Sequence, residues 1–242
     1  MKTIKSIISH AVSFVFPITC SLCSTDLPRG AKQRVCPSCF EGLTKNDGLI
    51  CKKCGVFLPD GGEHCYACLK DRKRFSFDTL RSPYVYQDGV RKLILKFKYS
   101  GRMFLTKEFE NSLADTAVKN NFHNLTECII PVPLNFVRRV KRGYNQAELL
   151  AFGAASKISK PVYTNVLYRK KITKPQFKLA KSARIENVKN SFLVKNIELI
   201  KNKNILLIDD VATTGATLST CAAALKLAGA KKVFALTLAR DM

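Results

Sequence analysis

The chain has 242 residues, of which 46% are hydrophobic and 24% charged, so it has the composition of an ordinary folded protein. That length allows one large core and a small second domain, and no apolar run is long enough to span a membrane. Lys and Arg outnumber Asp and Glu by 41 to 18, which favours a polyanionic partner such as nucleic acid or a phosphate-rich ligand, although solubility alone is the simpler explanation.

Residues 1–17 predict an amphipathic helix, because its apolar residues recur at helical spacing: Ile4, Ile7, Ile8, Ala11, Val12 and Val15. Serines and His10 interrupt this stretch and no small-residue cleavage site follows it, so it does not resemble an export signal. We therefore expect a cytoplasmic protein with no integral membrane segment. The basic, apolar helix allows a weak association with a membrane surface.

Eight of the ten cysteines form four Cys-x-x-Cys pairs: Cys20 and Cys23, Cys36 and Cys39, Cys51 and Cys54, and Cys65 and Cys68. Two residues between thiolates let one tight turn present both sulfurs to a tetrahedral zinc ion, and two such turns complete a four-sulfur site. The sequence thus predicts two zinc sites rather than disulfides. Similar central spacings favour sequential over interleaved pairing of the turns. Cys128 and Cys221 lie in apolar segments and are expected in the core.

Both predicted zinc sites are structural, because four thiolates leave no open position for a reacting group. So short a segment has little core of its own and should need the metal to fold. A charged stretch after Cys68 marks the predicted boundary. We expect a zinc-ribbon domain with the N-terminal helix over residues 1–70 and a second domain over residues 71–242.

The second domain shows alternating strand and helix patterns. Residues 79–101 predict a short strand or hairpin followed by a helix, and residues 104–120 a second helix. Further strands are predicted at 127–133, 161–169, 204–210 and 232–239, with helices at 145–159 and 217–227 and a long basic loop over 169–192. This alternation is typical of a parallel α/β sheet, in which ligands bind beyond the carboxyl ends of the strands.

The stretch ILLIDDVATTGATL, residues 205–218, places two acids at the end of a buried strand. A turn of small and hydroxyl residues follows and leads into a helix N-terminus, an arrangement suited to a phosphate: Val211, Ala212, Thr213, Thr214, Gly215, Ala216 and Thr217. Carboxylates behind a phosphate site fit a ribose 5-phosphate, with Asp209 and Asp210 accepting hydrogen bonds from the sugar hydroxyls. A magnesium site in another phosphate enzyme, or acids that only cap the helix, are the alternatives.

This stretch resembles the signature of type I phosphoribosyltransferases that binds phosphoribosyl pyrophosphate (PRPP). Together with the cysteine pairs and the segments FKYSG, PVP, RRVKRGYNQ and TKPQ, it resembles the ComF family of competence proteins along nearly the whole chain. The resemblance implies a type I phosphoribosyltransferase-like parallel sheet with flanking helices behind a double zinc-ribbon module. It also implies PRPP with Mg²⁺, incoming single-stranded DNA, and other DNA-uptake proteins, including a helicase, as partners in natural transformation.

The same resemblance assigns roles to two basic segments. Pyrophosphate would be held just after the strand at 127–133, by Arg138, Arg139, Lys141, Arg142 and Asn145. A flexible loop over 169–187 would close over PRPP and carry Lys170, Lys171, Lys174, Gln176 and Arg184. A solvated helix start and a basic linker are the plainer interpretations. Asn145 is also placed to cap the helix at 145–159.

Single-stranded DNA would need cations for its phosphates and aromatic rings for its bases. The predicted DNA-facing set is Arg91, Lys92, Lys96, Lys98 and Tyr99. No residue suggests a general base or an acceptor site, so catalysis stays open. Three hypotheses follow: a PRPP-binding competence protein that handles single-stranded DNA, a conventional phosphoribosyltransferase acting on a base or other small nucleophile, and a non-catalytic zinc-ribbon adaptor for nucleic acid.

Overall fold

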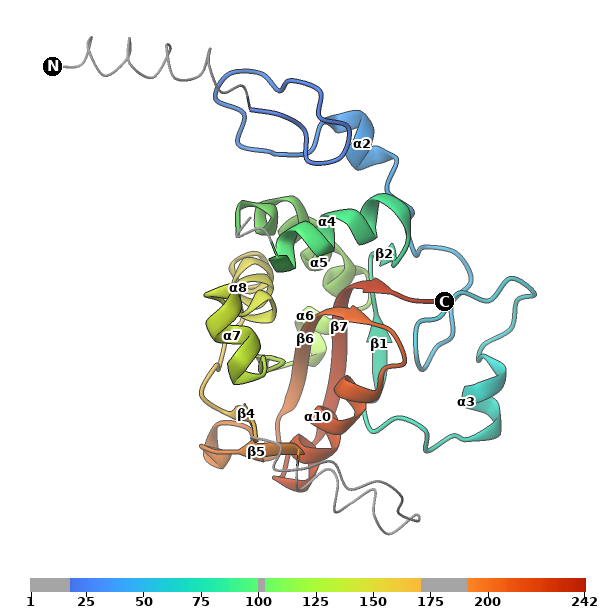
Figure 1. The fold of residues 1–242 in the computed structure, drawn as a ribbon. Coiled ribbons are helices and arrows are strands. Elements are labelled where there is room, and N and C mark those ends of the chain that lie inside the picture. The colour runs from blue at the N-terminus through green and yellow to red at the C-terminus, as the bar shows by residue number, and fades with distance from the viewer. Residues whose placement is uncertain (1–17, 100–102, 171–190) are drawn as a thin grey trace, which may run out of the picture.

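The computed structural model describes residues 18–99, 103–170 and 191–242 (Figure 1). The helix expected within residues 1–17 lies outside these ranges. So does most of the predicted flexible loop, including Lys171, Lys174, Gln176 and Arg184. No helix in the described ranges has the length and apolar character needed to cross a membrane.

A parallel sheet of five strands forms the centre of the molecule, as predicted. Its strands follow the order β1-β7-β6-β3, and β2 also pairs with β7. Their bounds are Thr79–Arg81 (β1), Tyr84–Val85 (β2), Cys128–Pro131 (β3), Asn204–Ala212 (β6) and Lys232–Arg240 (β7). The two long central strands, β6 and β7, bury most of their side chains, which explains their apolar runs at Ile205–Ile208 and Val233–Leu236.

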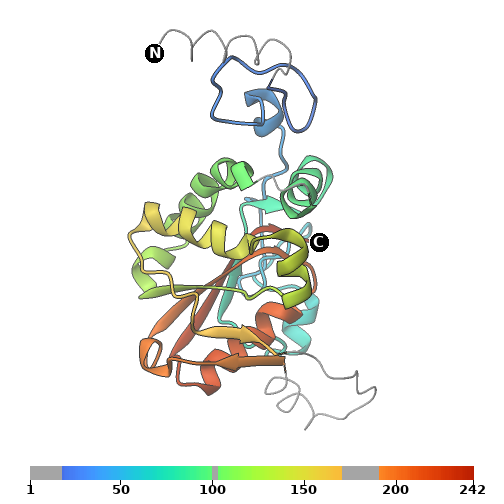
Figure 2. The ribbon, with the colours of Figure 1, turned by 60° about the vertical axis from the view of Figure 1, so that its left-hand side comes forward.

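Helices cover both faces of this sheet (Figures 1 and 2). Even-numbered residues of β6, such as Leu206 and Ile208, pack in one core cluster with α4 (Asp88–Tyr99), α5 (Thr106–Lys119) and α8 (Gln146–Ile158). Odd-numbered residues, such as Ile205 and Leu207, pack with α10 (Ala216–Leu227). The shorter helices are α2 (Pro37–Glu41), α3 (Tyr66–Lys70), η1 (Met103–Leu105), α6 (Phe122–Leu125), α7 (Phe136–Arg142) and η2 (Ile197–Leu199).

Three details differ from the sequence prediction. The strands β1 and β2 do not pair as a hairpin, because each lies parallel to β7. The strand expected over residues 161–169 shortens to β4 (Leu167–Arg169), which pairs antiparallel with β5 (Phe192–Val194) apart from the main sheet. The helical period that predicts α5 includes Leu105, Phe109, Leu113 and Val118, but Val118 is 52% exposed.

The two cysteine-rich ribbons pack on different sides of the domain. Residues of the first ribbon, including Cys20, Val35 and Leu43, join the core cluster of α4 and α5. Residues of the second ribbon, including Cys51 and Cys54, join the cluster of α10. Figure 1 shows the first ribbon beyond α4 and the second beside β1 and the C-terminus. The ribbons therefore share their apolar cores with the sheet domain.

Candidate functional site

Two groups of four cysteine sulfurs form the candidate metal sites. Cys20, Cys23, Cys36 and Cys39 make up the first cluster, and Cys51, Cys54, Cys65 and Cys68 the second; within each, all sulfurs lie within 4.8 Å of one another. The Sγ–Sγ distance is 3.8 Å between Cys23 and Cys36 and 3.7 Å between Cys54 and Cys65. Sulfurs about 2.3 Å from a tetrahedral zinc ion lie ~3.8 Å apart, so both clusters fit zinc, with sequential pairing of the turns.

Within the first cluster, neighbouring groups shift the pKa values of two thiols in opposite directions. The hydroxyl of Thr25 lowers the pKa of Cys23 to about 6, whereas the Cys36 thiol raises the pKa of Cys39 to about 12. Burial raises the pKa of Cys54 in the second cluster. A bound zinc ion would replace the retained protons, so zinc affinity should fall as the pH falls.

The segment from Val211 to Thr217 contains the predicted turn: Val211 and Ala212 end β6, residues 213–215 form the connection, and Ala216 and Thr217 begin α10. Gly215 adopts a left-handed backbone with φ of +75° at the N-cap of α10, and Thr214 Oγ1 accepts a hydrogen bond of 3.3 Å from the Ala216 amide. A Cβ atom at position 215 would lie 3.0 Å from the Phe75 ring. The turn surrounds a small hollow of about 30 Å³ at the helix N-terminus, where backbone amides suit an anion. We call Val211–Thr217 the phosphate loop.

Asp209 and Asp210 lie inside β6 rather than after it, because the strand continues to Ala212. Neighbouring residues of a strand point to opposite faces, so the two carboxyl groups meet different surroundings. Asp210 Oδ1 lies 2.9 Å from Lys98 Nζ at the end of α4, and both side chains are largely buried. Asp209 Oδ1 accepts a hydrogen bond of 2.8 Å from the Asp210 amide.

Asp209 is the most strongly perturbed carboxyl group of this site. Burial, followed by the negative charge of Asp210, raises its pKa to about 8, while Lys98 and Arg169 act in the opposite direction. A perturbed carboxyl group beside a possible anion site is typical of a functional centre. At neutral pH, Asp209 therefore retains its proton next to the ion pair between Asp210 and Lys98.

The predicted pyrophosphate residues lie on and after α7. Asn135 caps α7, whose Arg138, Arg139 and Lys141 are exposed. Arg142 contacts α4 and α8: its guanidinium lies 4.8 Å from the centre of the Tyr99 ring and donates to Gln146. Asn145 caps α8, as predicted, and its amide donates to the Val132 carbonyl after β3. Asn145 is thus buried and holds the backbone rather than facing solvent.

The predicted DNA-facing residues of α4 separate into two groups. Arg91 and Lys92 are exposed, and Tyr99 is 64% exposed. Lys96 instead donates to the Ser21 carbonyl of the first ribbon, and Lys98 pairs with Asp210. The sequence did contain a signal for Lys98, because it follows the buried Ile94 by four residues and so shares its helical face.

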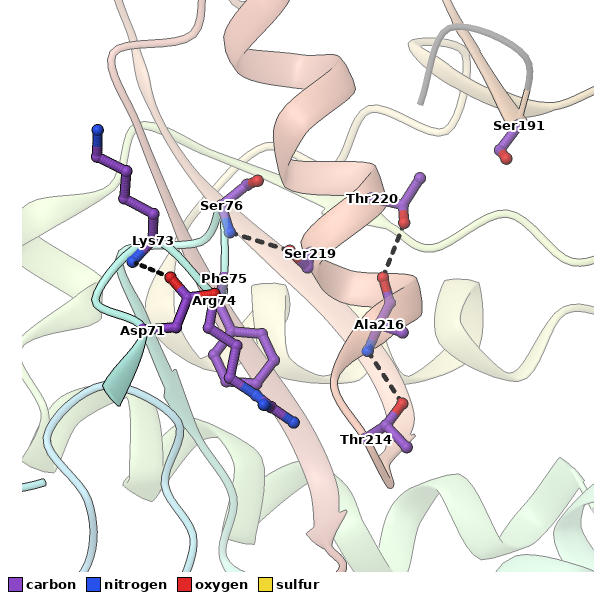
Figure 3. Close-up of a pocket in the computed structure, with 10 residues that line it drawn as sticks. All are labelled: Asp71, Lys73, Arg74, Phe75, Ser76, Ser191, Thr214, Ala216, Ser219 and Thr220. Atoms are coloured by element: carbon purple, nitrogen blue, oxygen red, sulfur yellow. Dashed lines mark hydrogen bonds between the residues drawn. The ribbon is translucent and has the colours of Figure 1, made fainter. Parts of the chain in front are cut away.

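A second, larger cavity of about 440 Å³ lies beside the phosphate loop, between the segment after the second ribbon and the first turns of α10 (Figure 3). Its lining combines polar and apolar groups: Asp71, Lys73, Arg74, Phe75, Ser76, Ser191, Thr214, Ala216, Ser219 and Thr220. The Ser76 amide donates to Ser219 Oγ at 3.0 Å, which ties this segment to α10. The cavity and the phosphate loop share Thr214 and Ala216.

Two residues near the site were not predicted from sequence. Arg169, at the end of β4, lowers the pKa of Asp209 through its charge. Arg240, at the end of β7, donates to the carbonyl groups of Ala212 and Thr213 in the phosphate loop. Lys170 is half-buried next to Arg169, and the remaining residues of the predicted flexible loop are outside the described ranges.

Two protein-family models match the chain, one in each half. A family model described as a double zinc ribbon domain matches residues 11–69. A second, described as a phosphoribosyl transferase domain, matches residues 122–242.

Three curated relatives match most of the chain. Competence protein F of Haemophilus influenzae is 31% identical over 217 residues, which cover 87% of this chain and 92% of the relative. Competence protein ComFC of Bacillus subtilis is 32% identical over 215 residues, covering 86% and 85%. The DNA utilization protein YhgH of Escherichia coli is 28% identical over 234 residues, covering 93% and 98%.

Proposed function

The chain belongs to the ComF family of competence proteins, and on this basis we propose that it binds PRPP and handles incoming single-stranded DNA in natural transformation. One observation supports this ligand most directly: the two acids and the phosphate loop lie at the same edge of the sheet. Asp209 and Asp210 lie near the end of β6, and the phosphate loop begins at the next residue, Val211. Phosphate and sugar diol would thus be held by one continuous segment.

Each part of the ligand would have its own partners. The amides at the N-terminus of α10 and the hydroxyls of Thr213, Thr214 and Thr217 would hold the 5′-phosphate. Asp209 and Asp210 would accept hydrogen bonds from the ribose hydroxyls, and Asp210 would exchange part of its contact with Lys98 for them. The exposed Arg138, Arg139 and Lys141 would approach the pyrophosphate.

Mg²⁺ would enter with PRPP, because carboxylate and phosphate oxygens are the ligands this ion prefers. When bound, it neutralises part of the pyrophosphate charge. The acidic pair fits such an ion, since only one cationic side chain, Lys98, forms an ion pair with it among the described residues.

Single-stranded DNA would bind on the exposed basic surface around α4 and α7. The two helices touch through Arg142 and Tyr99, and the surface carries Arg91, Lys92, Arg138, Arg139 and Lys141. The exposed Tyr99 ring offers a face for base stacking. The protein would act in the cytoplasm at the site of DNA uptake, beside a helicase and other uptake proteins.

A conventional phosphoribosyltransferase is the second candidate, and the raised pKa of Asp209 favours it. Carboxyl groups with a pKa near neutrality are common at sites of proton transfer. The substrate would then be a base or another small nucleophile, with pyrophosphate as the product.

Calorimetric titration with Mg-PRPP tests the ligand assignment. We expect the wild-type protein to bind, and the double variant Asp209→Ala/Asp210→Ala to lose at least about a hundredfold in affinity, because two hydrogen-bonding carboxyl groups are removed. Zinc content should stay at two ions per chain. Asp60→Ala, on an exposed turn of the second ribbon, is the control. Retained affinity in the double variant would show that the acids do not hold the ribose.

Pyrophosphate release distinguishes the two candidates. Mg-PRPP is incubated with the protein alone, with single-stranded DNA, and with free bases. The first candidate predicts one of two results: PRPP binds without turnover, or pyrophosphate is released only when DNA is present. Pyrophosphate release that requires a free base and does not change with DNA identifies the conventional enzyme.

A further inference from the structure

The side chain of Arg240 connects the second cysteine cluster to the phosphate loop. Its Nε donates to the carbonyl of Cys54 at 3.0 Å. Its Nη1 donates to the carbonyl of Ala212 at 2.9 Å, to that of Thr213, and to that of Asp241 at 2.7 Å. One guanidinium group therefore contacts a predicted zinc ligand and two residues of the loop.

Arg240 is an unusual residue for such a place, because it is only 8% exposed. None of the ion pairs found among the described residues includes it, so its positive charge is met by carbonyl dipoles. A zinc ion bound to four thiolates carries a net negative charge, which would favour a buried cation nearby. Two further cations lie near this cluster, and the cysteine charges act on both: Lys53 and Arg81.

The geometry of the guanidinium suits a fixed connection. Its donors form a rigid planar fork, so the Cys54 and loop carbonyls are held at a set separation as long as both ends are ordered. The Cys54 end depends on the metal, because a ribbon of this size loses its fold when its zinc is removed. Loss of that end would leave Arg240 free to move away from the loop.

The segment after the second ribbon also touches the loop. Phe75 lies against Gly215. The Ser76 amide donates to Ser219 on α10 (Figure 3). Phe75 belongs to the same core cluster as Cys54 and Leu218. Ordering of the second ribbon is thus transmitted to the loop by packing as well as by Arg240.

We propose that zinc in the second cysteine cluster sets the conformation of the phosphate loop, and that Arg240 is the positioning residue that carries this effect. The affinity for a phosphorylated ribose would consequently depend on zinc in the second cluster. The effect on affinity rests on the proposed function, whereas the effect on loop order does not.

Hydrogen exchange of the amides of residues 212–217, measured on the full-length zinc-loaded protein, is the direct test. Arg240→Lys keeps the charge but loses the fork. We expect loop exchange to be about tenfold faster or more, and PRPP affinity lower by a similar factor, because one to two charged hydrogen bonds are lost. Zinc content should remain at two ions per chain.

Arg81→Lys is the matched control. Arg81 also donates to carbonyl groups of the second ribbon, at Cys51 and Lys52, but its other partners are Leu80 and Asn120 rather than the loop. Its substitution should leave loop exchange and affinity at wild-type values. Equal effects of the two substitutions, or an unchanged loop in Arg240→Lys, would overturn the proposal.

Single ligand substitutions identify the cluster. Cys68→Ser in the second cluster should accelerate loop exchange, whereas Cys39→Ser in the first should not. Acceleration by both, or by neither, contradicts a specific role of the second cluster. If wild type bound no PRPP while loop exchange responded as expected, the proposed function would fail and the coupling would stand.

Discussion

At the residue scale, the protonation of Asp209 links the site to the stability of the fold. Its pKa in the folded protein is about 8, against 3.8 for an ordinary aspartate, because the half-buried group is partly removed from water and lies beside Asp210. Between these values the folded chain retains a proton that the unfolded chain has released. The contribution of Asp209 to the free energy of unfolding is therefore greatest at low pH and falls as the pH rises through 8.

The variant Asp209→Asn removes this titration. We expect the free energy of unfolding of the variant, measured relative to that of the wild type, to increase as the pH rises from 6 to 8. Above pH 8 this difference should stay constant. Urea denaturation at several pH values measures this, and the comparison cancels the pH dependence of zinc binding common to both proteins. Asp60→Asn is the control. Parallel profiles for wild type and Asp209→Asn would contradict the raised pKa.

Two other residues show which contacts could be predicted from the sequence and which could not. Lys98 has helical spacing from the buried Ile94, so its inward position could be predicted, although its partner Asp210 could not. Arg240 had no such signal, because its partner Cys54 is 186 residues away along the chain. Contacts of this length depend on the packing of the second ribbon against β7, which no local pattern describes.

At the element scale, the phosphate loop depends on the left-handed backbone of Gly215. Alanine there would adopt an unfavourable φ of +75° and bring its Cβ to 3.0 Å from Phe75. We expect Gly215→Ala to lower the free energy of unfolding by about 1–3 kcal/mol and to weaken PRPP binding, as measured by urea denaturation and calorimetry.

Gly229, just beyond the other end of α10, is a suitable comparison. It also has a positive φ, +101°, and its added Cβ would meet only Lys201 at 3.6 Å and beyond. Gly229→Ala should therefore cost stability without changing ligand affinity. If both variants kept wild-type affinity, the loop would not be the phosphate site.

Elements with a strong hydrophobic period were the ones that could be predicted. The helices α4, α8 and α10 and the buried strands β6 and β7 lie where their patterns placed them. The strand over residues 161–169 was predicted too long, because Val162 makes only an isolated bridge to Ile129 and regular pairing begins at Leu167. The acids of β6 remain in the strand because pairing with β7 continues to Ala212.

At the scale of the whole molecule, the charge is the property that a DNA-binding role depends on. The chain carries a formal charge of +23, and residues 138–189 alone contain 14 Lys and Arg against two acidic residues. Three of these cations lie exposed on α7: Arg138, Arg139 and Lys141. Binding through such contacts releases counterions and must weaken with added salt.

Fluorescence titration with a labelled single-stranded oligonucleotide measures this. Replacing the three cations of α7 by Gln should lower the slope of log affinity against log salt by about 2, since each phosphate contact contributes ~0.7. A matched triple variant uses the exposed Lys201, Lys231 and Lys232 near the amino end of β7 and should retain the wild-type slope. If the affinity of the wild type for the oligonucleotide did not change with salt concentration, an electrostatic DNA surface would be excluded.

The arrangement of the whole chain was only partly visible in the sequence. The four cysteine pairs predicted two four-sulfur sites, and their similar central spacings favoured the sequential pairing that the sulfur positions show. Spacing did not show that the ribbons would join opposite core clusters, the first against α4 and the second against α10. The proposed boundary at residue 70 therefore separates two parts that share buried surface.

The central claim concerns one segment, Asp209 to Thr217, and a crystal structure with Mg-PRPP examines it directly. The account predicts the 5′-phosphate within hydrogen-bonding distance of the amides at the start of α10, the ribose hydroxyls on the two carboxylates, and Lys98 displaced from Asp210 or shared with the ligand. Ligand density elsewhere, or an empty loop at a saturating concentration of PRPP, would contradict it.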